Sequence, residues 1–144
     1  MGSWLVDTDT LVRSRFVLSP FAETFAGLRL LDAGTGAHPG EDEWLRTHLP
    51  GYRAHLAADP VAQPLVRAAI GTSWIADFFC PTSCDGESFE DTVARVRATG
   101  AEEARANLRV SVRGPLPAVL DRDDLPERAT ALLTYVWTRT VRPY

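Results

Sequence analysis

Residues 125–141, LPERATALLTYVWTRTV, carry the strongest periodic pattern in the chain. Their apolar side chains recur at steps of three and four, the spacing that places side chains on one face of an α-helix. These positions are Leu125, Ala129, Leu132, Leu133, Val136, Trp137 and Val141. We therefore expect a long amphipathic helix that ends before Pro143. Because the stripe continues to Val141, we expect it to pack partly inside the domain and partly against a neighbouring subunit.

Upstream of this helix, capping residues and prolines mark where earlier helices begin. Ser19 followed by proline predicts a helix over residues 20–32. The acidic residues 41–43 suit the first turn of a second helix, which we expect to kink or restart at Pro50. A short third helix is expected over residues 61–71, with glycine at its end.

The middle of the chain contains an aromatic segment followed by two more helix starts. Residues 74–81 are too aromatic for solvent and too broken by flanking glycine and proline for a long helix, so we expect a buried connector. Ser88 can cap a helix that carries Phe89 and Val93. Residues 99–102, TGAE, match a capping box that opens a further helix.

The N-terminal region has a different pattern. The short apolar pieces at 4–6 and 16–18 are expected to form two strands of a small ribbon, with Asp9 capping a single helical turn between them. Together the patterns predict a mainly α fold, a compact multi-helix bundle with a short N-terminal β ribbon. A chain of 144 residues with 45% hydrophobic residues can bury one continuous core, so we expect a single domain over residues 1–144.

Charge and cysteine content argue against several classes of protein. The formal net charge of -4 provides no cationic field for a phosphate backbone, so we expect this segment itself not to bind DNA. Two cysteines do not make a disulfide-stapled secreted scaffold, and no apolar run reaches the ~20 residues of a membrane span. No targeting segment is visible. We therefore expect a cytoplasmic protein that does not enter a membrane.

Few residues are spaced for chemistry. Cys80 and Cys84 could hold a metal or form a redox pair, but no third ligand lies near them in the sequence, which favours ordinary thiols in a loop. The three histidines lack the spacing of a metallohydrolase, and no serine lies in a nucleophile elbow. Acidic clusters at 41–43 and 121–124 could suggest a cation site, but clusters ahead of helices are usually capping residues. We expect no catalytic residue, no metal site and no cofactor.

Aromatic side chains are the one feature that could serve a ligand. Small-molecule pockets are mostly apolar, with a few polar groups that orient the ligand. The competing interpretation is that these aromatic side chains pack in the hydrophobic core and bind no ligand. Tyr135 and Trp137 would add a hydroxyl and an indole N–H. The candidate effector pocket consists of Trp44, Trp74, Phe78, Tyr135 and Trp137.

Dispersed segments that together span nearly the whole chain carry a resemblance to a known family. They are residues 9–16, SPFAET at 19–24, 28–30, IADF at 75–78, 89–99 and LLTYVW at 132–137, with Pro143. In this combination the sequence resembles the N-terminal region of actinobacterial ArsR-type winged-helix transcription regulators, which have a long helical domain ahead of the DNA-binding domain. All 15 basic residues are arginine, which suggests the GC-rich coding bias that is typical of actinobacteria.

The resemblance implies a regulatory domain that pairs subunits into a homodimer and can bind a small hydrophobic effector. DNA would be contacted by a C-terminal winged helix, which this chain does not contain. The cysteines of metal-sensing relatives lie in that absent part, so the resemblance implies no metal sensing here. The alternative is a small cytoplasmic enzyme or stress protein whose chemistry the sequence does not show. A basic helix-turn-helix pattern further along the gene would favour the regulator.

Overall fold

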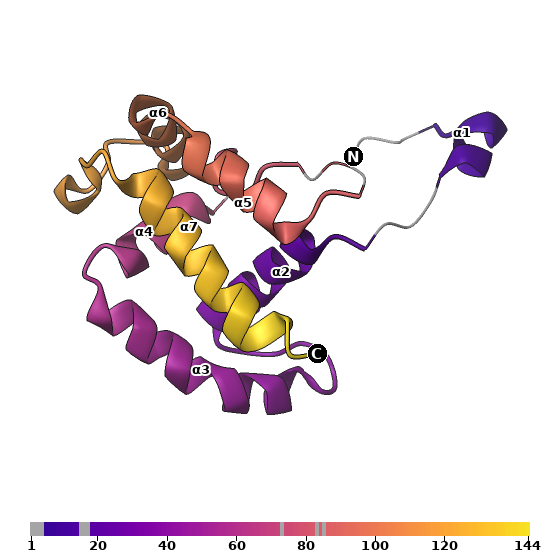
Figure 1. Cartoon of the computed structure of the whole chain (residues 1–144), viewed down its shortest axis with the longest axis horizontal. Helices are drawn as coiled ribbons and strands as arrows, with labels where there is room; N and C mark the ends of the chain where they lie inside the picture. The colour runs from indigo at the N-terminus through magenta and orange to yellow at the C-terminus, as the bar shows by residue number, and fades with distance from the viewer. Residues whose placement is uncertain (1–4, 15–17, 73, 83, 85) are drawn as a thin grey trace.

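The computed structural model describes residues 5–14, 18–72, 74–82, 84 and 86–144. Helices make up most of this part of the chain (Figure 1). The α-helices are α1 (Thr8–Arg13), α2 (Pro20–Ala33), α3 (Glu41–Ala58), α4 (Ala62–Ala69), α5 (Phe89–Ala98), α6 (Ala101–Val112) and α7 (Leu125–Val136). A 3-10 turn, η1 (Ala118–Leu120), precedes α7, and a π-helical turn, η2 (Trp137–Val141), continues it. The mainly helical fold predicted from the sequence is confirmed.

Helix α7 is the central element of the bundle. It packs against α2, α4, α5 and α6, and Figure 1 shows it crossing the middle of the molecule. Leu125, Leu133 and Val136 on this helix are completely buried. On this stripe the side chains of Trp137 and Val141 are partly exposed, and the others are buried. Most of the apolar face of the helix is thus covered by the chain's own helices, and the expected contact with a neighbouring subunit stays a prediction.

The predicted N-terminal β ribbon is wrong for the residues that the structure describes. Residues 8–13 form α1, and no strand is present in residues 5–14 or at Leu18. Asp9 was predicted to cap this helix, but the N-cap is Asp7. Its carboxylate accepts a hydrogen bond from the backbone N–H of Thr10 at 2.7 Å. A carboxylate placed this way starts a helix. The remaining ribbon residues, 4 and 16–17, lie outside the described residues.

Helix boundaries follow the local capping chemistry. Helix α2 begins as predicted, with Ser19 accepting the N–H of Ala22 at 3.2 Å. Helix α3 does not restart at Pro50, because buried residues before and after it, Leu45 and Tyr52, hold both halves against the core. The described part of the chain contains no helix with the length and apolar content needed to cross a bilayer.

Helices α5 and α6 show one correct and one wrong cap prediction. Ser88 and Asp91 form a reciprocal capping box at the start of α5. The capping box predicted at Thr99 is absent, because Thr99 ends α5 and its hydroxyl donates backward to the Arg95 carbonyl at 3.3 Å. Gly100 is therefore the N-cap of α6, without a side-chain hydrogen bond.

Candidate functional site

The five aromatic residues proposed as an effector pocket lie in different surroundings. The Trp44 indole N–H donates to the Thr140 carbonyl at 3.1 Å. Phe78 is buried in the core cluster. Trp44, Trp74 and Trp137 line three separate hollows. The structure therefore does not bring the five residues together, and each hollow has to be judged by the groups around it.

Tyr135 and Trp137 are occupied by aromatic neighbours. The Tyr135 ring stacks on His55 with ring centres 4.0 Å apart. The Trp137 ring stacks on Phe89 with ring centres 5.0 Å apart. Both side chains are only partly buried and pack against the core.

Trp74 differs from the other four because its segment is fixed while its own side chain is exposed. Ile70 and Ile75 form an antiparallel bridge, and the N–H of Ala76 donates to the Ala69 carbonyl at 2.9 Å. Further along, the N–H of Phe78 donates to the Asn107 side-chain oxygen at 2.8 Å. The buried connector predicted for this segment is thus present around Ala76 and Phe79, whereas Trp74 is 54% exposed.

Gly71 allows this turn to lie directly against the end of α6. A Cβ atom added at Gly71 would lie 2.2 Å from the Ser111 carbonyl oxygen and 2.8 Å from the Trp74 carbonyl oxygen. Neither oxygen can move freely, because each belongs to backbone. The buried Ser111 hydroxyl donates to the Ala68 carbonyl, which ties α6 to α4 at the same place. Gly71 is therefore required for the position of the turn that carries Trp74.

The turn and α2 line an open surface hollow of about 510 Å³, which we call the Trp74 hollow. Two of its lining residues carry charge: Arg29, which comes from α2, and Asp77 of the connector. The side chains of both lack a hydrogen bond or salt bridge to any other described residue. The remaining lining residues are Gly71, Thr72, Trp74, Ile75 and Cys80. The hollow thus combines an indole, an apolar wall and two charges of opposite sign that remain available to a ligand.

The Cys80 thiol is the nucleophilic group of the hollow. Burial raises its pKa, and the positive charge of the nearby Arg29 opposes that shift. A thiol with a raised pKa stays protonated at neutral pH, and the protonated form is the unreactive one. Cys80 and Cys84 are both free cysteines, with Cys84 exposed. Cys80 therefore belongs to the wall of the hollow and shows no sign of activation.

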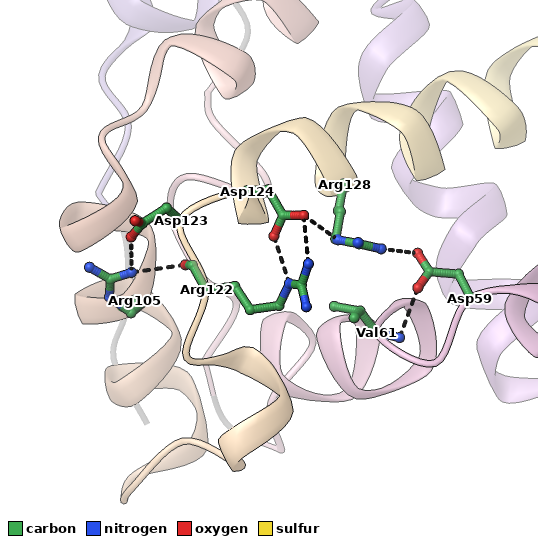
Figure 2. A network of polar contacts seen from close by, with 7 residues as sticks. All are labelled: Asp59, Val61, Arg105, Arg122, Asp123, Asp124 and Arg128. Atoms are coloured by element: carbon green, nitrogen blue, oxygen red, sulfur yellow. Dashed lines mark hydrogen bonds and ion pairs between the residues drawn. The ribbon is translucent and has the colours of Figure 1, made fainter.

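Residues 121–124 form the acidic stretch that we considered as a cation site, but arginine side chains pair with its carboxylates at Asp123 and Asp124 (Figure 2). Asp123 accepts a hydrogen bond from Arg105 at 2.7 Å, and Asp124 accepts one from Arg122 at 2.7 Å. The described residues contain no group of three or more potential ligands that could hold a metal ion. The carboxylates of Asp123 and Asp124 therefore serve in ion pairs within the chain.

Asp124 also belongs to a network that joins the start of α7 to the α3–α4 junction. Arg128 donates to Asp124 at 2.8 Å and to Asp59 at 2.7 Å, so it bridges the two carboxylates, as Figure 2 shows. The other oxygen of Asp59 accepts the N–H of Val61 at 2.9 Å. The hydrogen bond from Arg122, followed by the hydrogen bond and positive charge of Arg128, holds the pKa of Asp124 well below its usual range.

Comparison with known proteins adds no relative to this picture. No family model, no curated protein and no solved structure matches the chain. A function can therefore be inferred only from the residues of the chain itself, chiefly those of the Trp74 hollow.

Sequence reasoning found Trp74 but missed the charged residues beside it. Arg29 lies on the exposed side of α2 and Asp77 lies in the connector, and neither position shows a motif. Their juxtaposition depends on how α2 packs beside the turn at Gly71.

Proposed function

We propose that this chain is the regulatory domain of a bacterial winged-helix transcription regulator, and that it binds a small effector in the Trp74 hollow. In this proposal the domain is cytoplasmic and homodimeric, and a winged helix outside these 144 residues contacts DNA. The Trp74 hollow, in which neither Arg29 nor Asp77 pairs with another described residue, is the observation that supports effector binding. The resemblance to such regulators, which rests on dispersed segments over nearly the whole chain, supports the regulatory role.

The lining of the hollow favours a small molecule with a flat apolar part and two opposite charges. The exposed indole of Trp74 can stack on an aromatic ring. The Arg29 guanidinium can bind a carboxylate through two parallel hydrogen bonds, and Asp77 can accept from an ammonium group. The volume of about 510 Å³ lies within the roughly 300–1,000 Å³ typical of small-molecule sites. A free aromatic amino acid has all three features.

Binding is a better fit to this hollow than catalysis. The Cys80 thiol has a raised pKa, so it is held in its unreactive form. Asp77 and Arg29 can orient a ligand, but the hollow contains no histidine to pass a proton to a second group. The residues present therefore support recognition of a ligand without chemical change.

Titration calorimetry with three related probes tests the proposed site. L-Tryptophan has the ring, the carboxylate and the ammonium group, indole-3-propionate lacks the ammonium group, and tryptamine lacks the carboxylate. We expect L-tryptophan to bind most tightly. A charge-assisted hydrogen bond is worth ~1.5–3 kcal/mol, so each truncated probe should bind at least about tenfold more weakly.

Charge-neutral variants assign the binding to the hollow. Arg29→Gln should weaken L-tryptophan to the level of tryptamine, and Asp77→Asn should weaken it to the level of indole-3-propionate. Arg139→Gln and Asp121→Asn are matched controls, because both side chains are exposed and lie outside the hollow. Absence of L-tryptophan binding at millimolar concentration, or equal binding by all four variants, would contradict the proposed site.

The regulatory role has a separate test. If the gene continues into a basic helix-turn-helix segment, its full-length product should bind DNA, and L-tryptophan should change that affinity. DNA binding that L-tryptophan leaves unchanged, despite binding at the hollow, would contradict the regulatory role and leave the ligand site intact.

A further inference from the structure

A second hollow lies between α2, the first turn of α3 and the η2 turn, and we call it the Trp44 hollow. It is open to solvent, and its volume of about 370 Å³ lies within the roughly 300–1,000 Å³ of small-molecule sites. Its apolar wall includes Leu30, Trp44 and Val141. It shares no lining residue with the Trp74 hollow, so the two can bind different ligands.

The charged side chains that line the Trp44 hollow are both glutamates. Glu23 comes from the first turn of α2, and Glu41 is the first residue of α3. Glu23 makes no hydrogen bond or ion pair with another described residue. Among the described residues that line the hollow none is basic, so nothing in its wall neutralises the two carboxylates. The hollow is therefore anionic and favours a cation.

Glu41 is held in place by the loop that precedes α3. One of its oxygens, Oε2, accepts the backbone N–H groups of Ala37 at 2.6 Å and of His38 at 2.8 Å. These hydrogen bonds, that of His38 first, lower the pKa of Glu41 and keep its carboxylate charged at neutral pH. The other oxygen, Oε1, takes part in neither bond. It is thus available to a donor in the hollow.

The aromatic part of the wall is fixed and uncharged. The hydrogen bond from the Trp44 indole to the Thr140 carbonyl sets the position of the ring. The His48 ring packs on Trp44 with ring centres 5.0 Å apart, and its Nε2 shares a hydrogen bond of 3.1 Å with the Tyr144 hydroxyl. Desolvation lowers the pKa of His48, so its imidazole is neutral at neutral pH. Trp44 can therefore attract an ammonium group through its ring without a competing cation beside it.

Gly27 forms part of the floor between the two glutamate-bearing helices and η2. A Cβ atom added at Gly27 would lie 3.3 Å from the Val141 side chain and 3.6 Å from the Trp44 ring. The absence of a side chain at this position lets both of these apolar groups lie close to α2. The floor is thus apolar, whereas the charges come from Glu23 and Glu41.

Two carboxylates on different helices, beside an apolar wall, match a ligand with a positive charge at each end and an apolar middle. We propose that the Trp44 hollow binds a short aliphatic diamine, with one ammonium group at each glutamate and the methylene stem against Trp44. A metal ion fits less well, because the described residues contain no group of three or more potential metal ligands. A zwitterion such as L-tryptophan would bring its own carboxylate to two glutamates, which disfavours it here.

An NMR titration of the ¹⁵N-labelled chain at low ionic strength tests this site. The probes are putrescine, cadaverine and hexamethylenediamine, which differ only in the length of the stem, with pentylamine and pentanediol as analogues that lack one or both charges. We expect at least one diamine to give saturable shifts of the Trp44 indole N–H signal. Pentylamine loses one charge-assisted hydrogen bond and should bind about tenfold or more weakly, and pentanediol should not bind.

Charge-neutral variants assign the two ammonium groups to the two glutamates. Glu23→Gln and Glu41→Gln should each weaken the best diamine to the affinity of pentylamine for the wild type. Glu43→Gln is the matched control, because Glu43 also lies in the first turn of α3 but is exposed and outside the hollow. Its diamine affinity should equal that of the wild type. Circular dichroism of each variant verifies that the fold is retained.

Several results would overturn the proposal. These are the absence of a saturable Trp44 shift with every diamine up to millimolar concentration, equal affinity for pentylamine and the diamines, or equal diamine binding by the three glutamine variants. A Trp44 shift caused by Ca²⁺ but by no diamine would also refute it and indicate a metal site instead. The Trp74 indole should not move with the diamines, so failure here leaves the effector site of the proposed function untouched.

Discussion

Replacing Gly71 with alanine tests the packing that positions the Trp74 hollow. The added Cβ would lie 2.2 Å from the Ser111 carbonyl oxygen and 2.8 Å from the Trp74 carbonyl oxygen, distances at which backbone has to move. The turn is held by the hydrogen bond from Ala76 to Ala69, and α6 is held by the Ser111 hydroxyl on Ala68. The strain therefore cannot be relieved by rotating a side chain.

The expected cost follows from these two effects. Overpacking of a tight site costs ~1–3 kcal/mol, and loss of the hydrogen bond that closes the turn adds about 1 kcal/mol. Gly71→Ala should thus lower the free energy of unfolding by about 2–4 kcal/mol. For a chain of this size that corresponds to a fall in Tm of roughly 6–16 °C.

Thermal and urea unfolding followed by circular dichroism measure this cost. Gly114→Ala is the control, because its added Cβ meets no atom within 4 Å. That variant should unfold within about 0.5 kcal/mol of the wild type, as an unstrained surface change does. Equal unfolding midpoints for Gly71→Ala and Gly114→Ala would refute the close approach of the turn to α6.

Three further predictions concern the core, the ion-pair network and the thiols. Leu133→Ala removes a completely buried side chain from α7 and should lower the free energy of unfolding by about 2–5 kcal/mol in urea titrations; a cost under about 1 kcal/mol would contradict the central place of α7. Hydrogen bonds from Arg122 and Arg128 hold the pKa of Asp124 below its usual value, so this carboxylate adds stability that is present above the unfolded-state pKa of ~3.9 and lost as the pH falls below it. Asp124→Asn should therefore lose less stability than the wild type between about pH 6 and pH 3, and parallel pH profiles would show that the network contributes nothing. Burial raises the pKa of the Cys80 thiol, so iodoacetamide should alkylate it more slowly than the exposed Cys84 near neutral pH, as mass spectrometry can follow, and equal rates would contradict its burial.

The sequence predicted those parts of the fold in which the deciding interactions are local. The stripe from Leu125 to Val136 requires a buried face, whatever lies around it. Ser19 and Ser88 cap helices because their hydroxyls bind N–H groups three residues ahead. The capping box predicted at Thr99 was wrong, because the Thr99 hydroxyl donates to the Arg95 carbonyl in the preceding helical turn.

Predictions failed where distant parts of the chain decide the outcome. Helix α3 passes through Pro50 because tertiary packing of Leu45 and Tyr52 outweighs the missing N–H. Helices from distant parts of the chain cover most of the apolar face of α7, and the subunit contact that we expected there stays a prediction.

The candidate site could be predicted only in part. The aromatic connector pointed to Trp74, but the same reasoning also selected Trp44 and Trp137, which lie in other hollows. Composition does not distinguish an exposed tryptophan from a packed one. The contribution of Arg29 becomes visible only when α2 and the Gly71 turn are seen side by side.

An NMR titration of the ¹⁵N-labelled chain with L-tryptophan tests the ligand site most directly. The four tryptophans give separate indole N–H signals. Because Trp44, Trp74 and Trp137 line three different hollows, their signals show which hollow the ligand occupies. We predict saturable shifts at the Trp74 indole and at the backbone amides of Gly71, Thr72 and Asp77, with the Trp44 and Trp137 indoles unmoved. Shifts centred on Trp44 or Trp137, or no saturable shift up to millimolar L-tryptophan, would contradict the assignment of the Trp74 hollow as the effector site.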